Sequence, residues 1–330
     1  MNPLYKLPLH GIACEPFCDR ENANVEQSIN INFKTLNSKT FDESNNILPH
    51  WTIEDAGERY KTKVSLTIQN KSVNNPTYLL KVDCQGRGLF KIDKKNIDVC
   101  WDEIGTDSAH YFQTVGLALW LELNNILCIH ANALAYKNKA IAFVAPSRTG
   151  KTTLTAELCK SEFAVMTDDM MALHQKNNDY VVYPSWPVAR MWPETLTIIG
   201  NQHNKNELNK VHERFDKKIV TVNKESGFAF CNEPKKLNTI YILNRVEKNN
   251  KTNTPLNVCN ITTLSSAEAV ILLIQNSILG SAYKALSIEQ IRFLKLAELV
   301  KNVRVKKITY LSGKEYLNEI KQALINDLNE

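Results

Sequence analysis

One segment constrains the fold of this chain more than any other: Ala-Pro-Ser-Arg-Thr-Gly-Lys-Thr-Thr, residues 145–153. An apolar run, Ala140 to Val144, precedes it, and a helix-like segment, Thr152 to Lys160, follows it. This order predicts a strand, a loop and a helix that begins at Gly-Lys-Thr. In such a unit backbone N–H groups and a helix N-terminus hold phosphate, the lysine reaches the β- and γ-phosphates, and the hydroxyl binds Mg²⁺. We therefore expect a nucleotide-phosphate site formed by Pro146, Ser147, Arg148, Thr149, Gly150, Lys151, Thr152 and Thr153.

The loop departs from the usual G-x-x-x-x-G-K-[ST] pattern at its first position, where Ala145 replaces glycine. The alternative is a chance Gly-Lys-Thr in a surface turn. The flanking strand and helix are the context that the motif requires, and they favour the phosphate site.

Composition indicates a globular protein rather than a nucleic-acid-binding one. The chain has 330 residues, 43% of them hydrophobic, which suffices for one large or two ordinary domains with a proper core. Its formal charge of +5 comes from 40 Lys and Arg against 35 Asp and Glu. These charges are spread along the chain, and no dense basic run with interleaved aromatic residues occurs.

The cysteines and the apolar segments indicate the cytoplasm. Eight cysteines are scattered along the chain, several of them inside apolar runs, as expected for reduced thiols. Cys14 and Cys18 form C-x-x-x-C, but no second pair or histidine cluster follows at zinc spacing. The N-terminus lacks the continuous apolar segment of a signal peptide, and the longest apolar stretch, Val115 to Ala135, contains Glu122 and several asparagines. We expect a cytoplasmic protein that does not contact a membrane.

The pattern along the chain divides it into an N-terminal β-rich region, residues 1–108, and a second domain, residues 109–330. Residues 1–58 are polar and irregular, whereas alternating runs between Tyr60 and Asp102 predict a small antiparallel sheet. Ala109 to Asn125 predicts a mostly apolar helix. No heptad repeat or self-complementary stripe indicates an oligomeric state.

A strand over Leu127–Tyr136 and the short turn 137–139 predict an antiparallel hairpin with the strand that precedes the loop. Cys128, His130 and Asn132 would share one face of this strand. His130 would then reach the mouth of the phosphate loop. The alternative is a hydrogen-bonded histidine of the core.

The run Ala164 to Leu173 predicts an apolar strand, and two adjacent carboxylates, Asp168 and Asp169, lie within it. Burying two carboxylates without cationic partners is prohibitive, since each ion loses roughly several kcal/mol of solvation free energy even after the protein relaxes. A Mg²⁺ ion beside nucleotide phosphates answers this requirement, and the second carboxylate would accept a proton from an acceptor hydroxyl. The alternative is that both residues cap a turn at a strand end. In a regular strand the two side chains would point to opposite faces unless a bulge or strand end re-aims one of them.

A proline- and tryptophan-rich segment, residues 183–193, predicts a stiff, irregular ledge that carries Arg190. Arg190 would clamp phosphate or pack on Trp192. The polar segment from Asn201 to Lys218 predicts a mobile loop, in which a solvated charged face is favoured over a substrate-contacting role for Arg214, Lys217 and Lys218.

Taken together, these motifs resemble the HPr kinase/phosphorylase-like proteins. The resemblance rests on the order and spacing of residues 128–134, the loop 146–154, Thr167-Asp168-Asp169, and the ledge through Arg190 and Trp192. It is nearer to stand-alone HPr-kinase-like proteins, including lasso-peptide kinases, than to true HPr kinase. It implies an α/β fold with a mixed sheet, a P-loop kinase core related to phosphoenolpyruvate carboxykinase, and ATP-dependent phosphorylation of a serine hydroxyl.

The resemblance also implies roles for residues. Lys151 would hold the β- and γ-phosphates, Thr152 and Asp168 would bind Mg²⁺, and Asp169 would be the catalytic base, with His130 and Arg190 beside it. The further signature that true HPr kinases use to grip HPr is not evident, so HPr is disfavoured as the partner.

Three functions remain open. The first is a kinase for a serine of a peptide or protein, the second a kinase for a small hydroxylated metabolite, and the third a nucleotide-binding regulator that does not catalyse. The polar segment after Asn201 and the N-terminal sheet favour a sizeable acceptor. The pair Asp168 and Asp169 disfavours the regulator, because a sensor can dispense with the second carboxylate.

Overall fold

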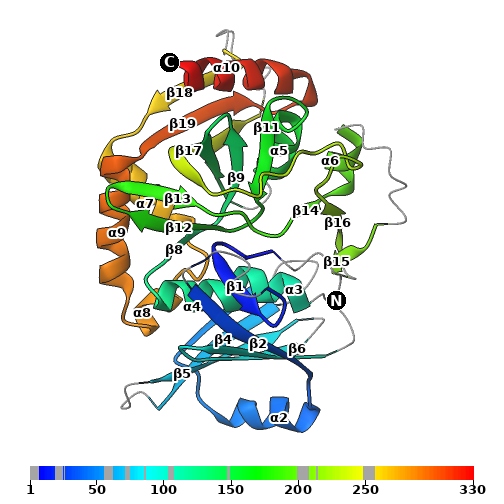
Figure 1. Ribbon diagram of the computed structural model, residues 1–330, viewed down its shortest axis with the longest axis vertical. Coiled ribbons are helices and arrows are strands. Elements are labelled where there is room, and N and C mark those ends of the chain that lie inside the picture. Colours follow the sequence, from blue (N-terminus) through cyan, green and yellow to red (C-terminus); the bar gives the residue numbers. More distant parts are fainter. Residues whose placement is uncertain are drawn as a thin grey trace.

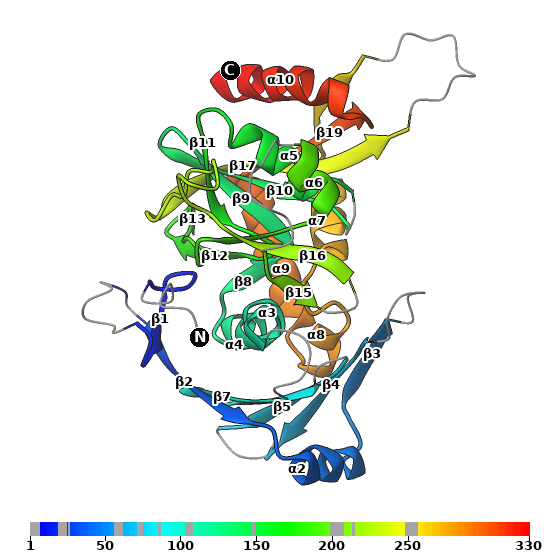
Figure 2. The same ribbon diagram turned by 90° about the vertical axis from the view of Figure 1, so that its right-hand side faces the viewer.

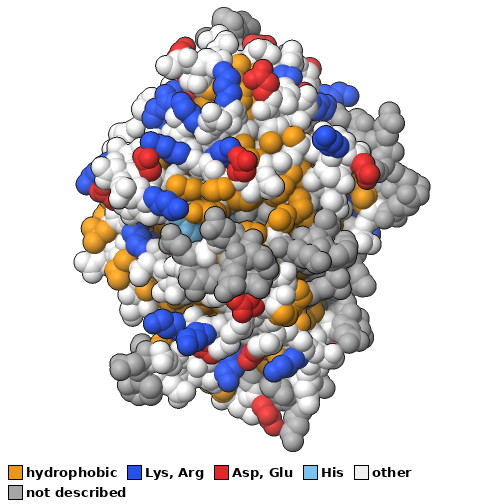
Figure 3. Space-filling view, in the orientation of Figure 1, with side chains coloured by type: hydrophobic (Ala, Val, Ile, Leu, Met, Phe, Trp, Pro, Cys, Tyr) orange, Lys and Arg blue, Asp and Glu red, His pale blue; other side chains and the backbone are white. Residues whose placement is uncertain are grey.

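The computed structural model describes residues 7–18, 25, 27–55, 62–70, 75–84, 87–102, 108–146, 149–198, 208–212, 215–247 and 257–330. Its described part is a mixed α/β protein built on a seven-stranded N-terminal sheet and a nine-stranded mixed sheet, with a three-stranded sheet beside the latter (Figure 1). None of the helices in these described ranges has the length and apolar character needed to cross a membrane. Basic side chains are scattered among acidic ones on the face shown in Figure 3.

The N-terminal sheet has the strand order β1-β2-β7-β6-β5-β4-β3. Its strands are β1 (Ile12–Glu15), β2 (Gln27–Thr35), β3 (Trp51–Asp55), β4 (Thr62–Gln69), β5 (Thr77–Asp83), β6 (Arg87–Ile92) and β7 (Asn96–Trp101), and helix α2 (Ser38–Glu43) follows β2. Neighbours from β3 to β7 are antiparallel, which confirms the antiparallel sheet predicted between residues 60 and 102. β1 and β2 extend it in parallel, so the irregular N-terminal segment contributes strands to the same sheet.

A continuous helical stretch lies over the concave face of this sheet (Figure 2). It consists of α3 (Ser108–Tyr111), a π-helical turn (Phe112–Gly116) and α4 (Leu117–Leu123), and it confirms the apolar helix predicted from residue 109. Its side chains pack with Phe90 and Val99 of the sheet. Gly116 is required here, because a Cβ would lie 2.9 Å from the Phe90 ring. The division of the chain at residue 108 into two domains stays a prediction.

The mixed sheet has the strand order β11-β9-β10-β17-β13-β12-β8, with β19 pairing β17 and β18 pairing β19. Its strands are β8 (Leu127–Ile129), β9 (Ala131–Tyr136), β10 (Lys139–Val144), β11 (Phe163–Thr167), β12 (Met171–Lys176), β13 (Asp179–Val182), β17 (Lys235–Val246), β18 (Cys259–Thr263) and β19 (Arg304–Leu311). β10, β17 and β19 run parallel, and β9 pairs antiparallel with β10, as the predicted hairpin requires.

Helices cover both faces of the mixed sheet because side chains of its central strands alternate between two apolar cores. Ile141 and Phe143 of β10 pack beneath α5 (Lys151–Leu158) and α10 (Leu317–Asn329). Ala140, Ala142 and Val144 pack against α7 (Ser266–Gln275) and α9 (Glu289–Asn302) on the other face. The two remaining α-helices of the described C-terminal part are α6 (Pro193–Ile198) and α8 (Ala282–Ala285), and a 3-10 turn, Lys314–Tyr316, precedes α10.

The third sheet corrects two expectations. It consists of β14 (Val188–Met191), β15 (Lys210–His212) and β16 (Phe215–Thr221), in the order β14-β16-β15. The centre of the ledge is therefore a strand, β14. Pro187 and Pro193 lie outside β14, so the backbone N–H groups of this strand remain able to pair with β16. The polar segment predicted as a loop likewise forms strands at 210–212 and 215–218. Residues 201–207 and 213–214 of that segment, Arg214 included, lie outside the described residues.

Candidate active site

The Gly-Lys-Thr segment connects β10 to α5, as the sequence predicts. β10 ends at Val144, α5 begins at Lys151, and residue 150 has φ +98°, a conformation that side chains other than glycine rarely adopt. Ala145 is fully buried and Lys151 is 6% exposed, so both residues lie below the surface. Ser147 and Arg148 lie outside the described residues.

The Lys151 ammonium lies inside the loop rather than in solvent. Its Nζ donates hydrogen bonds to the carbonyl oxygens of Ala145 and Pro146. Burial lowers the pKa of Lys151 to about 8, while the negative charges of Asp169 and Asp168 act to raise it. The lysine and both carboxylates therefore lie within electrostatic reach of one another.

Two predicted strands are each interrupted, and the interruptions lie opposite each other. His130 separates β8 from β9, and residues 168–170 separate β11 from β12. β11 pairs with β9 and β12 with β8, with Thr167 opposite Ala133 and Met171 opposite Ile129. Asp169 has φ +64°, so the chain turns sharply at the carboxylate pair. The prediction of one continuous strand through residues 164–173 is therefore wrong, and this strand end re-aims the two carboxylates.

Asp168 is buried, with 7% of its surface exposed. Its Oδ2 accepts a hydrogen bond of 2.7 Å from the backbone N–H of Arg190, whereas Oδ1 is a buried oxygen without a hydrogen-bond partner in the described part of the chain. Burial and the adjacent Asp169 charge raise the pKa of Asp168 to about 6. The N–H group that the Asp168 side chain binds belongs to Arg190, 22 residues away in sequence. Asp168 therefore does not cap its own turn.

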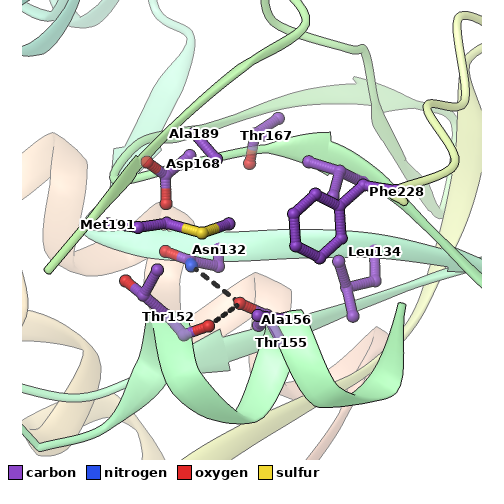
Figure 4. A pocket seen from close by; sticks show the side chains of 11 residues that line it. Asn132, Leu134, Thr152, Thr155, Ala156, Thr167, Asp168, Ala189, Met191 and Phe228 are labelled. Carbon is purple, nitrogen blue, oxygen red and sulfur yellow. Dashed lines mark hydrogen bonds between the residues drawn. The ribbon is translucent and has the colours of Figure 1, made fainter. Parts of the chain in front are cut away.

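Asp168 and Thr152 line the same cavity, which has a volume of about 10 Å³, and Figure 4 shows them on opposite sides of it. Asn132 connects these elements. Its Nδ2 donates to Thr155 Oγ1 of α5 (3.3 Å), and its Oδ1 accepts from the backbone N–H of Asp169 (3.2 Å). A single side chain thus joins the helix that follows the loop to the carboxylate turn.

Asp169 forms an ion pair with Lys217 of β16, in which Nζ lies 3.3 Å from Oδ2. The two side chains are only 12% and 18% exposed, so the solvated face favoured for Lys217 from the sequence is wrong. Burial raises the pKa of Asp169, but the positive charges of Lys217 and Arg190 outweigh burial and hold this pKa below its usual range. Asp169 is therefore ionised at neutral pH.

Arg190 and His130 lie beside the carboxylates. Arg190 is 4% exposed, its Nη2 donates to Gln113 Oε1 of the π-helical turn (3.4 Å), and its charge lowers the pKa of both carboxylates. Burial and the nearby Lys151 charge lower the pKa of His130 to about 4, so the imidazole is neutral. The sequence-predicted residues at 130, 151, 152, 168, 169 and 190 thus gather around one site.

Other residues of the site match the sequence predictions less closely. The Thr153 hydroxyl is 3.0 Å from the Thr195 hydroxyl of α6, so this side chain points away from the cavity. Asn132 and Gln113 were not predicted as site residues. Asn132 had a detectable signal, its shared strand face with His130, whereas nothing in the sequence pattern marks Gln113.

No family model matches the chain, and no curated protein matches it. Among solved structures, the chain is similar to the HPr(Ser) kinase/phosphatase from Coxiella burnetii. The two are 17% identical, the match covers 61% of this chain and 89% of that chain, and the TM-score is 0.33.

Proposed function

We propose that the protein is an ATP-dependent kinase that uses Mg²⁺ to transfer the γ-phosphoryl group to a serine hydroxyl of a peptide or protein. One observation carries the proposal. Thr152 and Asp168 line one cavity at the start of α5. Asp168 Oδ1 is buried without a hydrogen-bond partner among the described residues, and the charges of Asp168 and Asp169 act on Lys151.

The loop and the first turn of α5 supply phosphate binding. Phosphoryl transfer requires positioning and charge stabilisation more than covalent participation by the protein. Backbone N–H groups at a helix N-terminus and a lysine are suited to this task. Lys151 Nζ lies against the loop carbonyls of Ala145 and Pro146, which supports a role for it in binding the β- and γ-phosphates.

Thr152 and Asp168 fit Mg²⁺, because a hydroxyl and a carboxylate are the hard oxygen ligands that this ion prefers. The buried Asp168 Oδ1 has no hydrogen-bond partner among the described residues, as expected for a ligand atom. In the described ranges no cluster of three or more His, Cys, Asp or Glu forms a protein cage, which suits an ion that takes its other ligands from phosphate and water. When bound, Mg²⁺ neutralises charge on the phosphates.

Asp169 is suited to the acceptor hydroxyl. In the transfer, the hydroxyl oxygen bonds to the γ-phosphorus, the bond from that phosphorus to the bridging oxygen of ADP breaks, and Asp169 takes the hydroxyl proton. Its ionised state makes Asp169 a hydrogen-bond acceptor from the start. Lys217 and Arg190 place positive charge beside the transferred group.

A peptide or protein acceptor is supported by where the site lies. His110, on α3, is among the groups that lower the pKa of Asp169, and Gln113 contacts Arg190. The carboxylates thus lie where the helical stretch over the N-terminal sheet meets the mixed sheet. A small metabolite requires no such extended surface, and the serine acceptor follows from the sequence resemblance.

The test is transfer of label from γ-labelled ATP with Mg²⁺, read by mass spectrometry. Serine-containing peptides encoded beside the gene are compared with the same peptides carrying alanine, and with a mixture of hydroxylated metabolites. We expect a phosphate mass shift on the serine peptides alone. Label only in metabolites would favour the metabolite kinase, and tight ATP binding without transfer to any acceptor would favour the regulator.

A further inference from the structure

The helical stretch over the N-terminal sheet contains a π-helical turn close to the carboxylates. The turn spans Phe112–Gly116, between α3 and α4, and its buried residues are Phe112, Gln113 and Gly116. Single π-helical turns within α-helices are rare and occur frequently at functional sites. Here the turn buries two adjacent side chains, one apolar and one polar, and the two have different partners.

Phe112 fixes the turn against two other elements. The centroid of its ring lies 5.8 Å from that of Phe33, on β2 of the N-terminal sheet, in an edge-to-face arrangement. The same ring stacks with Trp186, with 6.1 Å between centroids. The carbonyl oxygen of Trp186 accepts a hydrogen bond from the backbone N–H of Val188, the first residue of β14. Aromatic pairs in these geometries add stability beyond their buried area, so the turn is held both to the N-terminal sheet and to the strand that carries Arg190.

Gln113 contacts the guanidinium of that arginine. Its Oε1 accepts a buried hydrogen bond of 3.4 Å from Arg190 Nη2. In the part of the chain that the structure describes, this is the only hydrogen bond of the guanidinium. The charge of Arg190 acts to lower the pKa of both Asp168 and Asp169, yet within the described ranges its side chain forms an ion pair with neither of them. The direction of the guanidinium is therefore set by an amide and not by a carboxylate.

A neutral partner preserves the charge of Arg190. A carboxylate at position 113 would also accept a hydrogen bond from the guanidinium, but it would neutralise the positive charge. An amide oxygen holds the side chain and carries no charge of its own. Preorganised positive charge that is not neutralised by the protein is what stabilises the charge that develops during phosphoryl transfer.

We infer that Gln113 is a positioning residue, a neutral acceptor that directs the Arg190 guanidinium at the transferred phosphoryl group and is held in place by the π-helical turn. The inference rests on the proposed kinase function and gives the segment packed on the N-terminal sheet a part in catalysis. Gln113 acts through Arg190 and does not itself touch the reacting atoms. The two residues are 77 positions apart in sequence, which is why no local pattern connects them.

The experiment is a double-mutant cycle on kcat, measured in the phosphotransfer assay with Mg²⁺ and a serine peptide. Its members are Gln113→Leu, Arg190→Met and the double variant. Gln113→Glu keeps a hydrogen-bond acceptor but places a negative charge beside the guanidinium. Gln175→Leu is the matched control, because Gln175 is exposed on β12, where its Nε2 contacts the carbonyl oxygen of Asn177. Thermal unfolding followed by circular dichroism shows whether each variant folds.

We expect Gln113→Leu to lower kcat about 10- to 100-fold with the KM for ATP nearly unchanged, because a misplacement of about 1 Å can cost about 100-fold. Arg190→Met should lower kcat about 10²- to 10³-fold, and Gln113→Leu should then add no further loss, because the side chain that Gln113 positions is absent. Gln113→Glu should also lower kcat although the protein remains folded. Gln175→Leu should have the kcat of wild type.

Full kcat in Gln113→Leu or in Gln113→Glu would overturn the positioning role while leaving the kinase function intact. A loss from Gln113→Leu that recurs undiminished in the Arg190→Met background would overturn it as well, since Gln113 would then act independently of Arg190. If Arg190→Met does not fold, Gln113→Glu decides, because a purely structural partner would gain an ion pair with Arg190 and keep full kcat. A wild-type protein that phosphorylates no acceptor would overturn the proposed function and this role together.

Discussion

Lys217 and Asp169 form a largely buried ion pair, 3.3 Å apart, between β16 and the turn that follows β11. The pair joins a residue of the three-stranded sheet to a carboxylate of the mixed sheet, 48 residues away in sequence. It keeps Asp169 ionised and brings a further cation, besides Lys151 and Arg190, to the place where phosphoryl transfer is proposed.

Lys217→Met should lower kcat by about 10²- to 10³-fold, the usual loss when one preorganised charge-stabilising group is removed. Lys217→Arg should restore part of this activity. Lys218→Met is the matched control, because Lys218 Nζ contacts the carbonyl of Leu208 instead of the carboxylate. Steady-state kinetics with a phosphorylated peptide as product provide the measurement. A fully active Lys217→Met enzyme would show that the ion pair is only structural.

A buried ionic network fixes α9 to α4 and β8. Glu122 Oε1 accepts hydrogen bonds from Arg292 Nε (3.1 Å), Tyr283 Oη (3.2 Å) and the backbone N–H of Cys128 (2.9 Å). Glu122→Gln should lower the free energy of unfolding by about 3–5 kcal/mol, because the buried Arg292 loses its counter-charge. Denaturant unfolding followed by circular dichroism measures it.

The control for this prediction is Glu298→Gln on the same α9. Glu298 pairs with Lys301 at the surface, where such pairs contribute about 0–1 kcal/mol. Equal small losses in the two variants would contradict a stabilising role for the buried network.

His10 should make stability depend on pH. It is 1% exposed, and burial, together with the nearby His174, lowers its pKa to about 3. Below its ordinary pKa of about 6.5 the unfolded chain binds a proton that the folded chain excludes, so this group costs roughly 1.4 kcal/mol per pH unit as the pH falls toward 3. His10→Asn, which tolerates the φ of +53° at this position, should have a shallower slope of unfolding free energy between pH 6.5 and 5. His130 is present in both proteins and contributes equally to the two slopes. Identical slopes for wild type and His10→Asn would therefore contradict this assignment.

Lys151→Ala should severely weaken binding of ATP, because it removes the cation aimed at the β- and γ-phosphates. Titration calorimetry measures the affinity, and far-UV circular dichroism should remain that of wild type. Undiminished affinity would refute the phosphate site. Ala145→Gly is a companion variant at the unusual loop position, for which unchanged or improved affinity is expected.

Local patterns predicted the parts of the site that depend on neighbouring residues. The run from Ala140 to Val144 followed by Gly150-Lys151-Thr152 predicted β10, the loop and α5, and the short turn after Tyr136 predicted the β9–β10 hairpin. These elements form because apolar alternation, turn length and a glycine of positive φ act over a few residues.

The interruption at His130 was not predicted, and a strand end at Asp168 and Asp169 was only the alternative, because the apolar pattern continues through both places. They arise where β9 and β8 pair with different segments, β11 and β12, and strand pairing is decided by tertiary structure. The same holds for Lys217, whose polar neighbours in sequence indicate a solvated segment although its partner is the buried Asp169.

The central claim is tested most directly by Mg²⁺ titration of phosphopeptide formation by wild type, Asp168→Asn and Asp169→Asn. Asp168 shares its cavity with Thr152 and Asp169 pairs with Lys217, so their roles should differ. We expect Asp168→Asn to raise the Mg²⁺ requirement, and Asp169→Asn to lower turnover by about 10²- to 10⁴-fold with ATP affinity nearly intact. Identical defects would contradict only the division of labour, whereas full activity in both variants would contradict the kinase mechanism.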